Sequence, residues 1–224
     1  MKKKALTILF VIFSGAAGKA IAQSINWADS TKKNKLVADL HTGYNYGFMA
    51  GIGYGYKMNT DLPLVINGEF SAPFGNKPFD DFKIKLGGIV EVATIKNFSV
   101  SLSAYGIFRR YQSAFVTLAG FGSEFSTVAG YYRRKWYFAG EAGFDKAIVT
   151  HIKNSALMKE NYPGGKDGWY LPTGGNFFYG IRSGISVSNN DVYLKIGKTA
   201  SQDLRITAII PYYCQVGITR KFRW

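Results

Sequence analysis

Apolar and polar side chains alternate with a period of two along much of the chain. Between residues 98 and 105, one side of the alternation is apolar and the other holds Ser99, Ser101, Ser103 and Tyr105. Similar alternation runs through residues 82–92, 136–145, 177–187, 192–197 and 212–224. A period of two is that of a β-strand with one apolar and one polar face. No window keeps a helical period long enough to compete, so the chain is predicted to be all-β.

Strand length and the make-up of the polar faces favour a membrane barrel over a soluble sandwich. The polar faces combine charged residues with Gly, Ser and Ala, as a narrow, watery barrel interior requires. Several strands run for about ten to fourteen residues, which fits a tilted crossing of the hydrocarbon slab better than an ordinary strand of five or six. The aromatic content of 16% and the 26 glycines suit a barrel with aromatic girdles. We predict a transmembrane, antiparallel, up-and-down β-barrel.

Counting the alternating segments gives about ten strands. Bacterial single-chain barrels have an even number of strands, short periplasmic turns and longer outer loops. Alternate connections here are short, at residues 59–61, 96–97, 133–135 and 189–190, whereas the other set includes the longer segments 74–80 and 153–175. The predicted strands are 35–44, 46–58, 62–73, 81–95, 98–109, 114–129, 136–152, 176–188, 191–199 and 208–224.

The first hairpin is the least defined of these predictions. Apolar residues keep a single phase from Leu36 through Met58, so this stretch also reads as one continuous strand. That reading would leave nine strands, and totals of eight or twelve therefore remain open beside ten.

The first 22 residues have the pattern of a cleavable export signal. Three lysines at positions 2–4 precede an apolar run from Ala5 to Phe13, and Ala20-Ile21-Ala22 offers small residues before Gln23. The apolar run is too short to cross a bilayer as a helix. We therefore expect residues 1–22 to be a Sec signal peptide and residues 23–224 to be one barrel domain in the outer membrane.

The charge balance points to anionic lipid rather than nucleic acid. The chain has 28 Lys and Arg against 14 Asp and Glu, a net charge of +14, and loss of residues 1–22 removes four lysines and no acid, leaving +10. Export argues against a nucleic-acid partner, so outer-membrane lipid and lipopolysaccharide head groups are the expected counter-charge. Cys214 is the lone cysteine, which excludes an intramolecular disulfide.

The last strand carries the most specific pattern in the chain. Tyr212, Cys214 and three further apolar residues lie on one face, and the sequence stops on Trp224. This pattern resembles the closing strand of the bacterial outer-membrane β-barrel superfamily, particularly small barrels in the style of OmpA and OmpW. The Ala-Ile-Ala-Gln junction and the basic, aromatic tail at 220–224 are similar to exported proteins of the Bacteroidota. The resemblance implies recognition by the barrel-assembly machinery through Val216, Ile218, Phe222 and Trp224.

Charges on the polar faces are expected to point into the barrel. Because a ten-stranded barrel is narrow, opposite charges should pair across the interior and occlude it. The excess positive charge should then lie in turns, loops and rims, at Arg110, Arg133, Arg134, Lys135, Lys153, Lys159, Lys166, Arg205, Lys221 and Arg223. The predicted interior set is nearly balanced and consists of Lys57, Glu69, Lys83, Lys85, Glu91, Arg109, Glu124, Glu141, Asp145, Arg182 and Lys195.

Catalytic chemistry has little support in the sequence. His151 lies near an outer rim, with Ser155 and Glu160 after it, but it lacks the His-x-Ser pairing of the lipid A deacylase family. His41 has no evident partner, and two distant histidines do not indicate a metal site. No catalytic residue, metal or cofactor is predicted.

The outer segment 153–175 is the most plausible contact surface. It carries Tyr162, Trp169 and Tyr170, and exposed aromatic residues often anchor interfaces. The leading hypothesis is a non-enzymatic outer-membrane barrel with a structural, surface-contact or envelope-complex role. A narrow channel for small solutes, a lipid-modifying enzyme and a soluble periplasmic β-protein are the alternatives.

Overall fold

The structure is a computed structural model that describes residues 26, 34–45, 47–58, 60, 62–74, 79–172, 174–202 and 211–223. The expected signal peptide and Trp224 lie outside the described residues. Ten long strands make the wall, and each pairs antiparallel with its neighbours. They are β1 (Asn34–Tyr44), β2 (Phe48–Met58), β3 (Leu64–Pro73), β4 (Asp81–Ile95), β5 (Phe98–Gln112), β6 (Val116–Arg133), β7 (Trp136–Asn154), β9 (Gly175–Val187), β10 (Asn190–Ser201) and β11 (Tyr212–Arg223).

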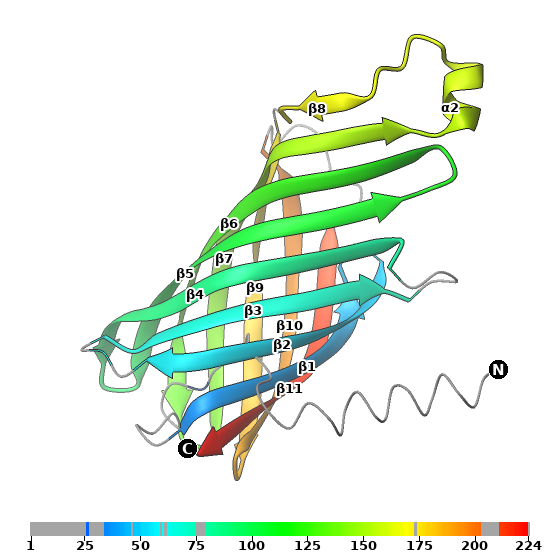
Figure 1. The fold of residues 1–224 in the computed structure, drawn as a ribbon. Helices are drawn as coiled ribbons and strands as arrows, with labels where there is room; N and C mark the ends of the chain where they lie inside the picture. Colours follow the sequence, from blue (N-terminus) through cyan, green and yellow to red (C-terminus); the bar gives the residue numbers. More distant parts are fainter. Residues whose placement is uncertain are drawn as a thin grey trace, which may run out of the picture.

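The sheet closes on itself. The strands follow one another around the wall in chain order, β7 pairs with both β6 and β9, and β1 pairs with β11 from Asn34↔Arg223 to Tyr44↔Cys214 (Figure 1). Closure pairs the backbone N–H and C=O groups between strands, which lipid requires because it offers them no water. The predicted antiparallel barrel of about ten strands is therefore confirmed.

The strand register fixes the tilt of the barrel. Paired residues lead from His41 through β2, β3, β4 and β5 to Gly120 on β6. In the other direction they lead through β11, β10, β9 and β7 to Tyr132 on the same strand. The pairing therefore closes with a shear of 12 residues, the separation between Gly120 and Tyr132. A shear slightly above the strand number belongs with strands tilted by roughly 35–45° and a narrow interior.

The distribution of apolar and polar residues is inverted relative to a soluble protein. Leu86 is 65% exposed and Ile52 54% exposed on the outer face, whereas Asp191 is 0% and Lys221 2% exposed inside. A ring-to-ring row of phenylalanines crosses the outer face of β3 to β6, with centroid distances of 5.8, 5.9 and 5.0 Å between Phe70, Phe82, Phe108 and Phe121. An apolar outer band with aromatic residues toward its ends is the surface of a barrel that meets lipid.

The first hairpin consists of two strands. β1 ends at Tyr44 and β2 begins at Phe48, and the rings of these residues contact edge to face with 5.3 Å between centroids. Gly47 in the turn has a φ of 139°, a conformation that residues with a Cβ rarely adopt. Apolar residues alternate in one phase from Leu36 to Met58, although the chain reverses direction in a tight turn between Tyr44 and Phe48.

Several strands extend beyond their predicted ends. β5 reaches Gln112 instead of residue 109, and β6 reaches Arg133 instead of residue 129. Arg110, Arg133 and Lys153 thus lie on strands rather than in loops. The prediction followed apolar alternation, which stops at the membrane interface, whereas strand pairing needs no apolar face and continues into water.

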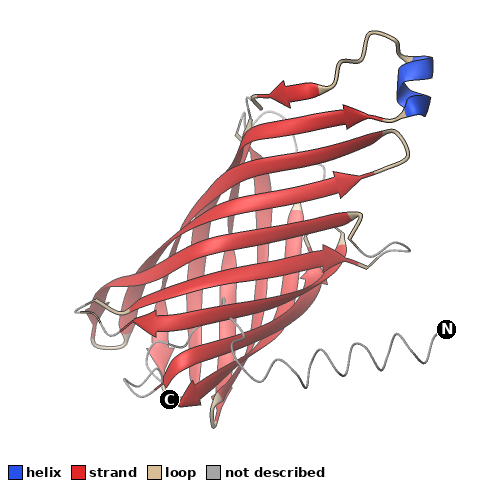
Figure 2. Cartoon of the chain, viewed as in Figure 1, coloured by secondary structure: helices blue, strands red, loops and turns tan. Residues whose placement is uncertain are grey.

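The wall is tallest at β6 and β7, which have 18 and 19 residues. Beyond it lie α2 (Ala156–Asn161) and β8 (Gly168–Tyr170), at the barrel end away from the C-terminus (Figure 2). β8 pairs with residues 150–152 of β7, where β9 no longer accompanies that strand. The segment predicted as a loop at 153–175 therefore contains a helix and a strand. Within the described residues, no helix is long and apolar enough to cross a membrane.

Candidate functional site

The barrel interior holds the predicted set of charged residues. Glu69, Lys83, Glu124, Glu141 and Lys195 are buried, and the other six members are partly exposed. Their alternation along each strand places them on the face opposite the lipid-facing side chains.

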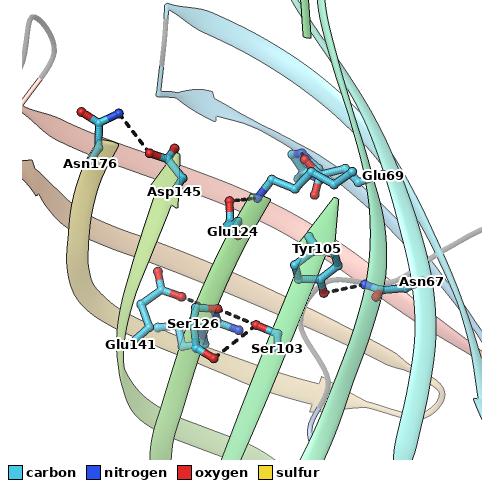
Figure 3. A network of polar contacts seen from close by, with 12 residues as sticks. Asn67, Glu69, Ser103, Tyr105, Glu124, Ser126, Glu141, Asp145 and Asn176 are labelled. Carbon is cyan, nitrogen blue, oxygen red and sulfur yellow. Dashed lines mark hydrogen bonds and ion pairs between the residues drawn. The ribbon is translucent and has the colours of Figure 1, made fainter. Parts of the chain in front are cut away.

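Ion pairs join different strands across the interior (Figure 3). Lys85 Nζ lies 2.6 Å from Glu124 Oε2, and Arg182 donates to Glu141. Glu141 Oε1 also accepts a hydrogen bond from Tyr213 Oη at 2.7 Å. These contacts satisfy charges that would be costly to bury singly, and they tie β4 to β6 and β7 to β9 and β11.

Polar contacts continue toward the outer mouth. Arg109 pairs with Asp81 at 2.9 Å, and Asn176 Nδ2 donates to Asp145 Oδ1 at 3.0 Å. A hollow of about 360 Å³ lies here, lined on its polar side by Lys83, Arg109, Asp145 and Asn176. Below it, the central cavity between the ion pairs measures about 110 Å³. That space accommodates a few waters.

The middle of the barrel contains a buried cluster that sequence reasoning missed. Asp39 accepts hydrogen bonds from Tyr193 Oη at 3.1 Å and Thr219 Oγ1 at 2.9 Å. His41 Nδ1 lies 2.7 Å from Asp39 Oδ1, and its Nε2 lies 3.8 Å from Glu69 Oε1. The alternation of β1 places Asp39 and His41 on one face, which was the available signal. Their partners are distant in sequence and could not be named without the fold.

The bulky Tyr193 side chain needs space over the adjacent strand. Tyr193 is 2% exposed and pairs with Gly217 on β11. A Cβ at Gly217 would overlap the Tyr193 ring, so only glycine at this position leaves room for the ring inside the barrel. Tyr132 and Tyr137 stack below it with 5.4 Å between ring centroids, and both are buried.

A further buried network closes the end with the short turns. Lys221 Nζ lies 2.8 Å from Asp191 Oδ1, and the backbone N–H of Asn26 donates to Asp191 Oδ2 at 3.2 Å. Asn26 Nδ2 also donates to Ser186 Oγ and to the carbonyl of Arg133, both at 2.8 Å. Lys221 was predicted at a rim, and this prediction is wrong: it faces inward because it continues the polar phase of β11 and has a buried carboxylate to pair with.

The outer segment is held against β7 by Asp167. This carboxylate accepts from Asn154 N at 2.8 Å and Nδ2 at 3.0 Å, and Lys159 Nζ lies 2.6 Å away. The hydrogen bond from Lys159, followed by the backbone bond from Asn154, lowers the pKa of Asp167 to about 2, so it stays ionised at physiological pH. Ser155 caps α2 by accepting from Met158 N at 3.2 Å. The segment is therefore an ordered extension of the wall.

The predicted contact residues lie on the surface of this extension. Tyr162 is 64%, Trp169 62% and Tyr170 43% exposed. Leu171 beside them is 77% exposed, so the apolar character extends beyond the aromatic rings.

His151 has an aromatic neighbour. Its ring centroid lies 4.9 Å from that of Trp169, and Ser155 is engaged in capping α2. This arrangement is a packing contact at the outer rim. Across the described ranges, no group of three or more His, Cys, Asp or Glu residues is placed to hold a metal ion.

The described part of the C-terminal pattern lies on the outer face. Val216 is 48%, Ile218 42% and Phe222 40% exposed, and Arg220 lies over the Phe222 ring at 5.4 Å. Cys214 is a free, exposed thiol on the same face. Val216, Ile218 and Phe222 therefore face the lipid.

A closed antiparallel barrel with an apolar outside and an ion-paired inside is the architecture of an outer-membrane β-barrel. No family model and no curated protein matches the chain. Similar solved structures include the KdgM porin, at 9% identity with a TM-score of 0.41, covering 84% of this chain and 99% of that one. The same porin in complex with disordered oligogalacturonate has 10% identity, a TM-score of 0.42 and the same coverage. The outer membrane protease OmpT from Escherichia coli has 8% identity and a TM-score of 0.46, covering 84% of this chain and 94% of that one.

The Lys221–Asp191 pair gives a test of the interior network. Replacing Lys221 by Met leaves the Asp191 charge buried without its ammonium partner, so we expect the free energy of unfolding to fall by about 3–5 kcal/mol. The double variant K221M/D191N should recover part of this loss. The measurement is urea unfolding of the protein inserted in lipid vesicles.

The matched control is Lys198→Met, because Lys198 is an exposed cation over the Tyr212 ring. It should change the free energy of unfolding by less than about 1 kcal/mol. Equal effects of K221M and K198M would contradict the inward placement of Lys221.

Proposed function

We propose that this protein is a non-enzymatic, integral outer-membrane barrel that carries a contact surface on its outer side. The contact surface consists of residues 156–171, which include α2, β8 and the exposed Tyr162, Trp169 and Tyr170. The observation that carries the proposal is the contrast between a filled, ion-paired interior and an ordered, apolar projection at the mouth.

The interior supports a closed barrel rather than a channel. The central cavity of about 110 Å³ is lined by Lys85 and Glu124 and by Arg182 and Glu141, which are ion-paired. At the other end, Asp191, Lys221 and Asn26 are each no more than 2% exposed. Moving an ion along this path requires breaking buried charge pairs, each of which is costly to separate in a low-dielectric interior.

The contact surface suits another component of the cell envelope. Its aromatic side chains offer large, rigid contact areas at low entropic cost, and Asp167 fixes the segment in place before binding. Lys153 and Lys166 are exposed in or beside the same segment, and Lys159 is exposed but paired with Asp167; this positive charge also favours phosphate-bearing lipopolysaccharide as a neighbour. Assembly would proceed through recognition of the β11 strand by the barrel-assembly machinery.

Conductance distinguishes the closed barrel from the narrow channel. Purified protein reconstituted in planar lipid bilayers is expected to give no current steps above background in simple salt solution, because no open path crosses the interior. Heat-modifiable gel mobility confirms that the inserted protein is folded. Reproducible steps of defined size from folded protein would contradict the proposal and favour the channel.

The contact role is tested by the size of the native assembly. Extracted in mild detergent, the parent protein is expected to migrate as a complex larger than a single barrel. The double variant Tyr162→Ser and Trp169→Ser should migrate as the barrel alone, because it removes the two most exposed rings of the contact surface.

The matched control is Phe48→Ser, which removes a 70% exposed ring from the first outer turn, away from the contact surface. This variant should keep the assembly. A parent that migrates as a lone barrel, or a double variant that keeps the complex, would show that these rings are not a contact.

A further inference from the structure

Four exposed cations gather on two adjoining turns at the short-turn end of the barrel. Lys96 lies in the β4–β5 turn, and Arg133, Arg134 and Lys135 lie at the β6–β7 turn. The two turns are neighbours, because Tyr132 N donates to the Asn97 carbonyl at 2.7 Å. Segments 94–98 and 131–138 contain no acidic residue, so the charges of this basic cluster are not neutralised within the turns.

Arg133 is fixed in orientation by a tyrosine. Its Nε and Nη2 donate to Tyr131 Oη at 3.0 and 2.7 Å, and its Cζ lies 5.4 Å from the centre of the same ring. Asn97 Nδ2 donates to that hydroxyl at 3.2 Å and holds it in place. A guanidinium has five N–H donors in a planar fork, so donors remain for a phosphate while the side chain is already ordered.

The basic cluster opens toward the membrane. Phe98 is 48%, Trp136 47% and Phe138 51% exposed on the outer face, and the Trp136 ring lies 5.7 Å from that of Tyr131. Tyr132 and Tyr137, which alternate with these residues, are buried on the inner side. Arg133 therefore lies where the apolar band ends and aromatic rings begin, which is the depth of lipid head groups.

We propose that Arg133, together with Lys96, Arg134 and Lys135, binds the phosphate of an anionic phospholipid in the periplasmic leaflet. The short turns of this class of barrel face the periplasm, so the lipid comes from that leaflet. A soluble periplasmic polymer would approach from the water beyond the turns, whereas the Arg133 guanidinium lies over a ring of the lipid-facing surface. The membrane-side approach therefore favours a lipid.

Quenching of Trp136 fluorescence tests this site, because Trp136 lies beside Tyr131. The protein carries Trp27→Phe, Trp169→Phe and Trp224→Phe, so that Trp136 is the reporter. It is reconstituted in phosphatidylcholine vesicles that contain either brominated phosphatidylglycerol or phosphatidylcholine brominated on the same acyl chains. We expect phosphatidylglycerol to bind beside Trp136 at least about fivefold more tightly, and Arg133→Gln to lower that preference about fivefold. Arg133→Lys, which keeps the charge without the planar fork, should give an intermediate preference.

Arg220→Gln is the matched control, because Arg220 is another exposed arginine over an aromatic ring, on β11. It should leave the preference near Trp136 unchanged. Equal quenching by the two lipids in the parent, or an equal loss in R133Q and R220Q, would overturn the proposal. Heat-modifiable mobility shows that each variant is folded, and R133K keeps the test decisive if R133Q does not fold.

Discussion

The pairing of β1 with β11 is the constraint on which the rest of the structure depends. In lipid, an open sheet edge leaves rows of unpaired N–H and C=O groups, and each group costs several kcal/mol. The register from Asn34 to Tyr44 against β11 removes that edge. Closure at this strand number and a shear of 12 then fixes a narrow interior, and the alternation of side chains assigns every residue to lipid or to that interior.

The narrow interior explains why the buried residues are so polar and yet so well connected. Side chains from adjacent strands, or from strands two apart, meet within a few ångströms, so Lys85, Arg182 and Lys221 each find a carboxylate. Tyrosines fill the remaining space where glycines on adjacent strands allow it, as Tyr193 does against Gly217. The interior is therefore filled largely by paired charges and tyrosines. One end of the barrel carries the ordered segment 156–171, where we propose a contact, and the other carries the basic cluster around Arg133.

The alternation and loop parity predicted most of the fold because both follow directly from membrane crossing. The luminal residues could be selected by phase alone, but their partners could not, since Asp39 and Thr219 are 180 positions apart. The prediction for Lys221 was wrong because a charged residue near a strand end is usually exposed to water. In the structure, Lys221 points into the barrel and pairs with Asp191 on β10. The extension of β5, and the helix and strand after β7, lie beyond the outer edge of the apolar band, whereas the extension of β6 lies beyond its edge at the short-turn end. There the period-two signal fades while backbone pairing continues.

The central claim, that the outer face of this barrel meets lipid, is tested most directly by thiol accessibility. In a Cys214→Ser background, Leu40→Cys places a thiol at the middle of β1 on the outer face, where the native side chain is 50% exposed. Ala156→Cys places one in α2 beyond the wall. In membranes, a charged, membrane-impermeant maleimide is expected to label A156C and to leave L40C unlabelled until the protein is unfolded. Labelling of L40C as fast as A156C in intact membranes would contradict the account.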